Sequence, residues 1–489
     1  MSRISGSSTF EGVLIDWSLG QPVDPPQLPV GLLSKRQAAA ELARRQRRQA
    51  MDAAYEADLI LRLAELTPDD DDPEAGSPGA RAPGWSAADG EASGVSEFFA
   101  GELALVLNRG RGTARHLHHR ALAWRENLPA TYAALAAGEL DVARAGALAD
   151  VLGSTRPELA RAVEAILLPE AVDLSVARLR ARALELLAEL DAPAADQRRE
   201  RAKQTADVFL QPGADGMATL GAELSADEAA EAYAVIDQLA RLAKADGDER
   251  PIAAVRTELF SLLLRRPGGH GQPGVAAQLT ITATLDSLEG GSARAGSVDG
   301  LVITAGHARE LLARIGALGL TAPDGGSLTF AITDGGGRLL ATTTVAELLR
   351  VATKGCVQHP GEDCACPVLG APGATHGYQP TDRQQTFTKT RDRTCRMPNC
   401  GQRVGWADLD HVVAHSCGGP TACTNLCCLC RSHHRLKTFA RGWQFVMEPD
   451  GTLHVTTPSG ITRTTRPPGL RRPPPEPPPD QPDDHPPPF

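Results

Sequence analysis

The chain has 489 residues, of which 42% are hydrophobic and 4% aromatic, and its formal net charge is −10. This length suits two to four domains better than a single core. The sequence contains no run of about eighteen apolar residues, and its first residues, MSRISGSSTFEG, have neither a basic nor an apolar signal region. These features argue against a membrane-spanning or secreted protein, and we expect a cytoplasmic one.

The charge is distributed unevenly along the chain. Between Arg383 and Met447 there are ten Lys and Arg against three Asp, so the remaining residues carry about seventeen net negative charges. An acidic protein with one small basic segment is typical of a local site for a polyanion. Chance clustering of basic residues is the alternative.

The first half of the chain has a mainly helical pattern. Residues 1–30 are expected to form a flexible leader, and 31–66 a helix rich in Ala, Leu and Arg. An acidic linker rich in Pro and Gly follows over 67–96 and should be disordered. Helical periodicity then extends over 97–270. One apolar stripe, expected to be a packing face, consists of Val172, Val176, Leu179, Ala183, Leu187 and Leu190.

Alternating periodicity begins near residue 271 and predicts a small α+β segment over 271–350. Apolar residues alternate from Leu279 to Leu285 and again from Leu328 to Ile332, as in half-buried strands. The second run precedes TDGGGR, a glycine-rich hairpin turn. Between the two runs, AGHARELLARIGALG has a helical pattern that ends at glycine.

The last part of the chain divides by composition. Residues 351–382 form a cysteine-containing linker, 383–450 a compact domain, and 451–489 a Pro-rich tail. Such a tail cannot bury a core and should be extended and disordered. The predicted fold is therefore a mostly α N-terminal region, a small α+β segment and a compact C-terminal module.

Cysteine usage points to a metal site. All ten cysteines lie between Cys356 and Cys430, and in a reducing cytoplasm such a cluster is more often a metal site than a set of disulfides. Two closely spaced pairs suit one tetrahedral structural zinc, with Cys395, Cys400, Cys430 and His433 as ligands. Separate packing of these side chains is the alternative. Whether a second zinc is bound stays open for Cys356, His359, Cys364 and Cys366.

The compact domain contains an ordered set of polar residues. Its sequence reads Cys-x4-Cys, Asp-His, Gly-Gly, Asn-Leu and Leu-Cys-x2-His-His-x2-Lys. In this order it resembles the HNH endonuclease family, whose lettered residues would be His411, Asn425 and His434. The resemblance implies that 383–450 is a nuclease domain, a zinc-stabilised ββα-metal module. In this family two strands and a helix hold one catalytic metal against DNA.

A second resemblance concerns the region before this module. The stretches LPATYAALAAGELDVARAGALADVL (128–152) and GYQPTDRQ (377–384) are similar to a long domain of unknown function. That domain precedes the nuclease module in a large group of bacterial proteins. This likeness implies no activity.

Phosphodiester hydrolysis needs an activated water and a group that stabilises charge on the phosphate. A neutral imidazole is a good base for water near pH 7, and His411 is the candidate. Asp410 and His434 can hold a divalent cation, Mg²⁺ or Mn²⁺, and leave positions open for water and phosphate. Some family members have a further histidine where this chain has Thr438, which predicts weaker metal binding or a degenerate site.

Three further residues have supporting roles in this interpretation. The resemblance implies that Asn425 fixes the loop that orients His411, although an Asn before a helix is more commonly an N-cap. Arg435 and Lys437 follow on the expected final helix, where they could contact phosphates that flank the cleavage site.

The leading hypothesis is a metal-dependent DNA endonuclease, and the resemblance implies 5′-phosphate and 3′-hydroxyl products. The alternative is a zinc-stabilised, non-catalytic DNA-binding or regulatory protein, which needs neither Asp410 nor His411. A third hypothesis is an interaction scaffold built on the helical region, which is also a candidate for self-association. The target sequence, and whether one or both strands are cut, cannot be predicted from the residues.

Overall fold

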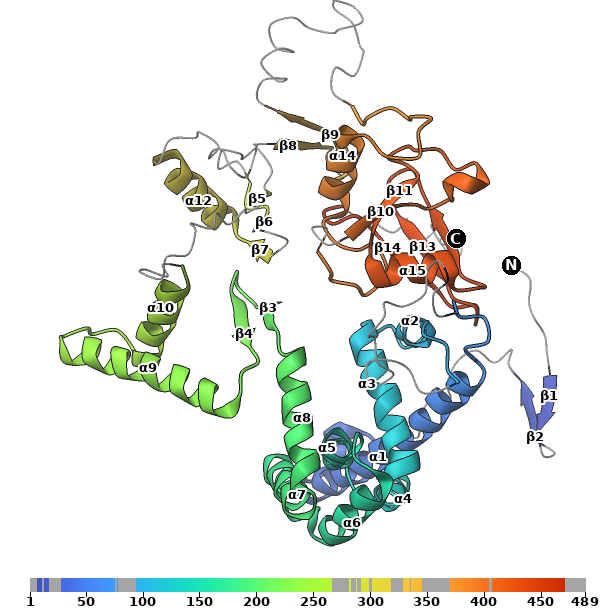
Figure 1. Ribbon diagram of the computed structural model, residues 1–489, viewed down its shortest axis with the longest axis vertical. Helices are drawn as coiled ribbons and strands as arrows, with labels where there is room; N and C mark the ends of the chain where they lie inside the picture. The colour runs from blue at the N-terminus through green and yellow to red at the C-terminus, as the bar shows by residue number, and fades with distance from the viewer. Residues whose placement is uncertain are drawn as a thin grey trace, which may run out of the picture. The chain divides into compact units, whose positions relative to one another are not determined.

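A computed structural model describes residues 7–10, 13–16, 28–74, 77, 94–265, 281–282, 287, 292–298, 301–317, 329–334, 336–344, 370–403 and 407–470. The chain divides into two units that alternate in sequence. The first comprises Met1–Leu61 and His119–Leu187, and the second Arg62–His118 and Ala188–Phe489. Figure 1 shows their helices and strands, coloured along the chain. Every candidate site residue lies in the second unit.

Helices dominate the first unit. The segment expected to be helical over 31–66 forms α1 (Lys35–Glu65). The elements that follow are the π-helical turn η3 (Ala123–Asn127), α4 (Pro129–Ala136), α5 (Val142–Leu152), α6 (Pro157–Leu167), the 3-10 turn η4 (Leu168–Glu170) and α7 (Val176–Leu190). Their fully buried leucines, which form the core, include Leu128, Leu135, Leu148, Leu152, Leu167, Leu179 and Leu187.

Local sequence signals fix where these helices begin. Asp141 is the N-cap of α5, and its side chain accepts hydrogen bonds from the backbone N–H groups of Ala143 and Arg144. Pro129 and Pro157 occupy the first turns of α4 and α6, where the missing N–H would have no partner in the helix.

The predicted apolar stripe is buried only in its middle. Leu179, Ala183 and Leu187 are almost inaccessible to solvent, whereas Val172 and Leu190 are 54% and 51% exposed. The packing face of α7 is therefore shorter than the sequence period suggested. Residues 1–30, expected to be a flexible leader, contain the paired strands β1 (Ser7–Phe10) and β2 (Val13–Asp16) and the first residue of the 3-10 turn η1 (Val30–Leu32).

A β-hairpin interrupts the region expected to be helical over 97–270. Strands β3 (Val208–Pro212) and β4 (Ala218–Ala222) pair antiparallel. Asp215 and Gly216 lie between them with φ of 55° and 74°, and an Asp-Gly turn with positive φ matches the twist of a hairpin. The remaining helices of this stretch are α2 (Phe99–Val106), α3 (Arg111–Leu122), α8 (Ala192–Thr205), α9 (Ala226–Ala245) and α10 (Ile252–Arg265).

Strands and a helix occur where the α+β segment was expected. The described elements are β5 (Ile281–Thr282), β6 (Gly296–Val298), β7 (Leu301–Ile303), α12 (Ala305–Ala317), β8 (Thr329–Thr333) and β9 (Leu339–Thr344). β8 and β9 pair across the predicted glycine-rich turn. Most of the alternating run that begins at Leu279 lies outside the described residues.

The C-terminal module begins with helix α14 and continues to residue 470. Its elements are α14 (Asp382–Asp392), β10 (Ala407–His411), the 3-10 turn η6 (His415–Cys417), β11 (Leu426–Cys430), α15 (Arg431–Phe439), β12 (Gln444–Met447), β13 (Leu453–Thr456) and β14 (Thr462–Thr465). β10 and β11 pair antiparallel, and α15 follows β11 directly. Their arrangement is visible in orange and red in Figure 1.

The prediction of a disordered tail over 451–489 is wrong for its first part. β12, β13 and β14 form a three-stranded antiparallel sheet, and Leu453 and Val455 of β13 are completely buried. Thr and Val at alternating positions suit such a strand despite the neighbouring prolines. Residues 471–489 lie outside the described part of the chain.

Helix α2 belongs to the core of the C-terminal module. Phe98 and Leu105 pack in one cluster with Val412, Leu429 and Leu436. A Cβ atom at Gly101 would lie only 2.5 Å from Cδ1 of Leu436, so the absence of a side chain there allows α2 to approach α15 closely. A segment some three hundred residues upstream thus completes this core.

The ends of the predicted acidic linker are ordered by contacts with each other. Pro68 forms a β-bridge with Val95. The Asp72 carboxylate accepts hydrogen bonds from Ser96 Oγ at 2.7 Å and from the Glu97 backbone N–H at 2.6 Å. Disorder is therefore the wrong prediction for these ends, and much of the middle of the linker lies outside the described residues.

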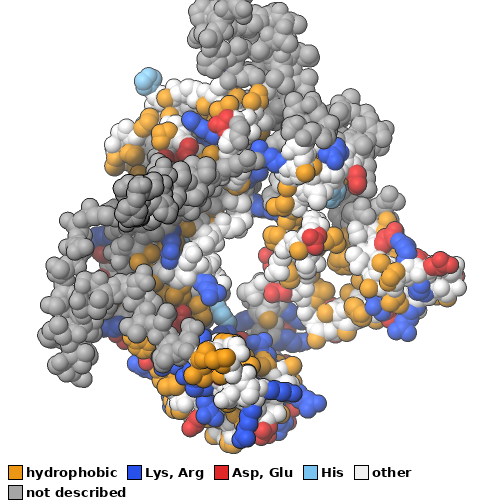
Figure 2. Space-filling model, turned by 180° about the vertical axis from the view of Figure 1, so that it is seen from behind, with side chains coloured by type: hydrophobic (Ala, Val, Ile, Leu, Met, Phe, Trp, Pro, Cys, Tyr) orange, Lys and Arg blue, Asp and Glu red, His pale blue; other side chains and the backbone are white. Residues whose placement is uncertain are grey.

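Basic and acidic side chains are interspersed over the face seen in Figure 2. Along α1, Arg44 pairs with Glu41 and Arg48 with Asp52. Exposed pairs of this kind add little stability. No helix among the described residues combines the length and apolar character needed to cross a membrane.

Candidate functional site

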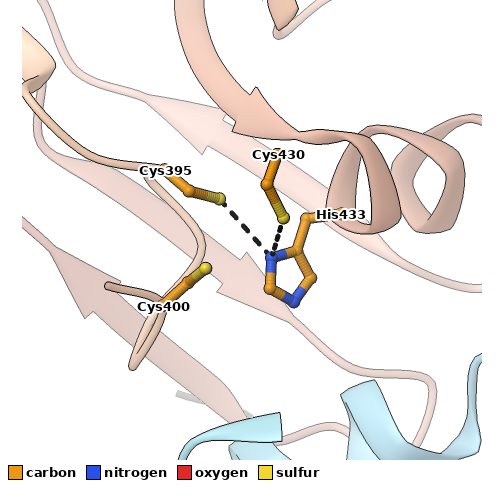
Figure 3. A group of neighbouring side chains, drawn as sticks. All are labelled: Cys395, Cys400, Cys430 and His433. Carbon is orange, nitrogen blue, oxygen red and sulfur yellow. Dashed lines mark hydrogen bonds between the residues drawn. The ribbon is translucent and has the colours of Figure 1, made fainter. Parts of the chain in front are cut away.

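The four predicted zinc ligands lie together. Cys395 and Cys400 flank a tight turn in which Asn399 has a φ of 62°, and Cys430 and His433 are at the start of α15. Their ligand atoms all lie within 4.8 Å of one another. Figure 3 shows the three sulfur atoms directed towards the His433 ring. The group can hold a metal ion such as zinc.

The geometry and charge of this cluster suit a cation. Nδ1 of His433 is 3.4 Å from Sγ of Cys395 and 3.2 Å from Sγ of Cys430, and ligands of one tetrahedral zinc lie about 3.5 Å apart. Hydrogen bonds with Cys395 and Cys400 lower the pKa of Cys430. Burial acts to lower the pKa of His433, but its hydrogen bonds to Cys400 and Cys430 raise it to about 9. Negative charge on sulfur therefore attracts a positive partner.

A second polar group lies on the strand–strand–helix unit. Asp408 and Asp410 are two residues apart on β10, so their side chains project from the same face of the strand. That face meets His434, in the first turns of α15. His434 is the side chain that joins the two carboxylates.

The His434 ring lies between these aspartates. Nδ1 is 2.9 Å from Asp408 Oδ2, and Nε2 is 3.5 Å from Asp410 Oδ1. A carboxylate only accepts hydrogen bonds, so Nδ1 carries a proton in its contact with Asp408, and Nε2 faces Asp410. Burial acts to raise the pKa of Asp408, but hydrogen bonds from His434 and Arg431 lower it overall.

The predictions did not include Asp408. Its position two residues before Asp410 on a strand was the signal that could have revealed it. A carboxylate that orients a histidine in this way is common beside metal-binding imidazoles, because it fixes the tautomer.

The Lys437 side chain is directed at Asp410 and at the backbone of His411. Its Nζ is 2.9 Å from Asp410 Oδ2 and donates a hydrogen bond to the His411 carbonyl oxygen at 2.7 Å. Both side chains of the Lys437–Asp410 pair are nearly buried, at 10% and 12% exposure. Lys437 therefore holds β10 against α15, and its contact with flanking phosphates stays a prediction.

His411 is at the end of β10, with its ring in contact with other aromatic rings. Nε2 lies 2.8 Å from Oγ1 of Thr421, Tyr378 stacks on the ring at 5.5 Å, and the His415 ring is 5.6 Å away. Burial lowers the pKa of His411, and the charges of His415 and Lys437 add to this effect against the opposing influence of Asp410. The imidazole is therefore neutral near pH 7.

Asn425 closes the loop between His411 and β11. Its Oδ1 accepts a hydrogen bond from the Val413 N–H at 2.9 Å, and its Nδ2 donates to the carbonyl oxygens of Val413 and Pro420, each at 3.0 Å. The residue is 7% exposed. It ties the two ends of the loop together and does not cap a helix.

Comparison with known proteins places most of the chain in one family. Residues 37–392 match the family described as "Domain of unknown function (DUF222)". This chain belongs to the DUF222 family. The match ends at Asp392, the last residue of α14, so the Cys395–His433 cluster and the Asp408–His434 group follow the DUF222 region.

Relatives of this DUF222 protein share shorter stretches. It is 40% identical to the uncharacterized protein Rv3776 of Mycobacterium tuberculosis H37Rv over 119 residues. These residues are 24% of this chain and 21% of the relative. It is 42% identical over 123 residues, 25% of this chain and 20% of each relative, to the uncharacterized proteins Rv2100 of the same strain and MT2160 of strain CDC 1551. The matched stretch thus spans about a fifth of the curated relatives. No solved structure matches the chain.

The DUF222 region also supplies a partner for Arg435. The guanidinium forms two hydrogen bonds to the Glu97 carboxylate, at 2.7 and 2.9 Å, and the Glu97 side chain is 7% exposed. This bidentate pair connects α15 to the residues before α2. The geometry gives Arg435 an ion pair within the protein, and its phosphate contact stays a prediction.

Part of the positive charge between Arg383 and Met447 is buried inside the protein. Arg391 and Arg396 are buried, and both pair with the buried carboxylate of Asp392. Asp392 also accepts a hydrogen bond from the Cys428 N–H. These arginines connect α14 to β11 and to the last sheet, so fewer cations face solvent than the composition suggests.

The other described cysteines lie outside the cluster. Cys427 and Cys428 on β11 are completely buried, and burial raises the pKa of both thiols. Cys423 is also buried, whereas Cys417 is exposed. Whether a second zinc is bound stays open. Its four possible ligands lie outside the described residues: Cys356, His359, Cys364 and Cys366.

Proposed function

We propose that this DUF222 protein is a metal-dependent DNA endonuclease of the HNH type. It would hydrolyse phosphodiester bonds and leave 5′-phosphate and 3′-hydroxyl ends. The proposal rests on one observation above all, the position of His434 between Asp408 and Asp410, with His411 next to Asp410 along β10. These residues would supply a hard oxygen ligand, an oriented imidazole and a base on one strand–strand–helix unit.

The distance between Asp410 and His434 fits a shared divalent cation. Two ligand atoms, each about 2.1 Å from one ion, are separated by about 3.0–3.5 Å, and Asp410 Oδ1 and His434 Nε2 are 3.5 Å apart. Mg²⁺ or Mn²⁺ would be held by these two side chains and by water. The ion, when bound, supplies charge neutralisation at the scissile phosphate and at the leaving oxygen.

The side chains of the chain have distinct tasks in this reaction. His411 accepts a proton from water as the water oxygen forms a bond to phosphorus, and the bond from phosphorus to the 3′ oxygen breaks. Asp408 holds the His434 ring so that its Nε2 faces Asp410 Oδ1, where the two side chains would share the ion. Lys437 fixes the second oxygen of Asp410 and the backbone of His411. Solvent returns a proton to the leaving oxygen.

Arg435 and Lys437 both form ion pairs within the protein, so another cation is better placed for the DNA backbone. Arg431 begins α15, and its side chain is 77% exposed beside Asp408. A cation so close to the reacting groups could contact a phosphate next to the cleavage site. We therefore assign the phosphate contact to Arg431.

The test is cleavage of supercoiled plasmid by the purified full-length protein with Mg²⁺ or Mn²⁺. His411→Ala should reduce the cleavage rate by about 10²- to 10⁴-fold, and Asp410→Asn should abolish metal-dependent cutting. His454→Ala is the matched control, because this imidazole lies on β13 and bonds to Thr464 and Glu448. Undiminished cutting by the His411 variant would refute its role as the base.

The alternative, a non-catalytic zinc-stabilised DNA-binding protein, has its own supporting observation. Thr438 stands where a third metal-binding histidine could be, and its hydroxyl donates to the His434 carbonyl oxygen at 2.8 Å. Lys437 already neutralises Asp410. DNA binding that weakens with salt, without cutting in Mg²⁺, Mn²⁺ or Zn²⁺, would favour this alternative.

A further inference from the structure

The stretch GYQPTDRQ (377–384) lies against His411 in the fold. It covers the turn before α14 and the first residues of that helix, and it falls within the DUF222 match. Tyr378, in this stretch, stacks on the His411 ring with an interplanar angle of 20°. The contact joins the end of the family region to the candidate base.

Hydrogen bonds from the same segment hold the backbone of Thr421, whose side chain contacts His411. Gln384 is completely buried, and its Nε2 donates to the Thr421 carbonyl oxygen at 2.8 Å. The Thr375 N–H donates to the same oxygen at 2.9 Å. Thr421 itself has no exposed surface, and its hydroxyl is 2.8 Å from Nε2 of His411.

The Gln384 side chain is itself fixed. Its Oε1 accepts a hydrogen bond from the Thr381 N–H at 2.9 Å as part of the capping box of α14, and its Nε2 also donates to the Gly373 carbonyl oxygen. A buried amide with partners on both ends has one orientation. Thr421 is therefore held against a rigid support.

A neutral imidazole has one donor and one acceptor nitrogen. If Nε2–H donates to the Thr421 hydroxyl, Nδ1 carries the lone pair that can accept a proton from water. If the hydroxyl lost its fixed position, the ring could turn and both tautomers would be populated. Only one of the two tautomers leaves Nδ1 ready to act as a base.

We propose that Thr421, supported by Gln384 and Thr375, is a positioning residue that fixes the ring and the tautomer of His411. Tyr378 covers one face of that ring and limits its rotation. The role in catalysis rests on the proposed nuclease function, whereas the effect on the ring does not. The last helix of the DUF222 region is thus part of the active site and not a linker before it.

The decisive experiment compares Thr421→Val with Thr421→Ser in the full-length protein. Val keeps the shape and loses the hydroxyl, and Ser keeps the hydroxyl. For plasmid cleavage, Thr421→Val should lower kcat by about 10- to 100-fold with an unchanged KM, while Thr421→Ser retains most of the rate. Both variants should keep wild-type zinc content.

A second measurement is independent of cleavage. Ring ¹⁵N spectra at pH 8, with the His411 signals assigned by their loss in His411→Gln, should show a single tautomer in the wild type and in Thr421→Ser. Thr421→Val should show averaging of the two forms. If the wild type cuts no DNA, the nuclease proposal fails and these spectra alone decide the positioning role.

Tyr378 offers a pair of variants with little risk to folding, because this side chain is 65% exposed. Tyr378→Phe keeps the stacked ring and should retain the rate, and Tyr378→Ala should lower kcat and broaden the His411 signals. Equal behaviour of Val and Ser at position 421, in both rate and spectrum, would overturn the proposal. If Thr421→Val and Thr421→Ser lost equal amounts of rate, packing and not the hydroxyl would be responsible.

Discussion

Gly419 occupies the tightest point of the loop that Asn425 closes. A Cβ atom at this position would lie 1.9 Å from the Val413 carbonyl oxygen and 2.9 Å from Nδ2 of Asn425. Neither partner can move without breaking the hydrogen bonds between Asn425 and Val413. Close packing therefore explains why glycine occupies position 419, the second of the Gly-Gly pair.

We expect Gly419→Ala to destabilise the C-terminal module by about 2–4 kcal/mol, because the added methyl group displaces backbone and leaves buried polar groups without partners. Urea denaturation would measure the change in the free energy of unfolding. Gly401→Ala is the matched control, since a Cβ atom there has no neighbour within 4 Å. A loss below about 0.5 kcal/mol at Gly419, within the usual range for surface substitutions, would contradict this account.

Single residues differed in how far the sequence revealed them. Cys395, Cys400, Cys430 and His433 could be predicted because short spacings within each pair are a local property. Asp408 was readable from strand periodicity and was overlooked. Thr421 could not be recognised, because its contact with His411 depends on the course of the loop between them.

At the scale of elements, α2 and α15 depend on each other. Glu97 precedes α2 and pairs with Arg435 of α15, and the Glu102 side chain of α2 accepts a hydrogen bond from the Ser459 N–H at 3.0 Å. Arg463 donates to the Leu105 carbonyl oxygen near the end of α2. These polar contacts surround the apolar packing of Gly101 against Leu436.

Glu97→Ala should therefore destabilise the module by about 1–3 kcal/mol, because it leaves the half-buried Arg435 guanidinium without its carboxylate. Adding Arg435→Met to Glu97→Ala should recover part of the lost stability, because the double variant has no unpaired charge at this position. Thermal unfolding of the two single variants and the double variant would give the coupling energy. Strict additivity of the two changes would show that the pair does not interact.

Elements were predicted well where the signal was local and poorly where it was not. The α1 and α12 helices follow from continuous periodicity. The β3–β4 hairpin was missed although its Asp-Gly turn is a short-range signal, because the surrounding helical pattern was extended across it. β13 was missed because its Pro-rich neighbours resembled a disordered tail, and its burial depends on packing with distant residues.

At the scale of the whole molecule, the units are formed from stretches that alternate along the chain. Domain boundaries inferred from composition could not show this, because composition changes mark linkers and not contacts between distant segments. The 383–450 prediction contains the candidate site residues but excludes α2 and β13, both of which complete the module core. Its stability should then depend on two separate supports, the upstream helix and the metal cluster.

Removal of a metal ion held by the Cys395–His433 cluster should affect the C-terminal module and spare the first unit. Cys395 is in the core cluster of the C-terminal module and Cys430 packs against it, and structural zinc supplies about 10–16 kcal/mol of apparent folding energy in small domains. A strong chelator, or Cys400→Ser, should raise amide hydrogen exchange across residues 395–456. The buried helices of the first unit, such as α5 and α6, have their own leucine core and should stay protected.

Mass spectrometry of the exchanged protein, with zinc content measured in parallel, would test this. Cys417→Ser is the matched control, because Cys417 is an exposed thiol outside the cluster. It should keep both the zinc and the wild-type exchange pattern. If the chelator removed zinc and the exchange of residues 395–456 did not change, the metal would not support this fold, and the packing of α2 against α15 would be sufficient.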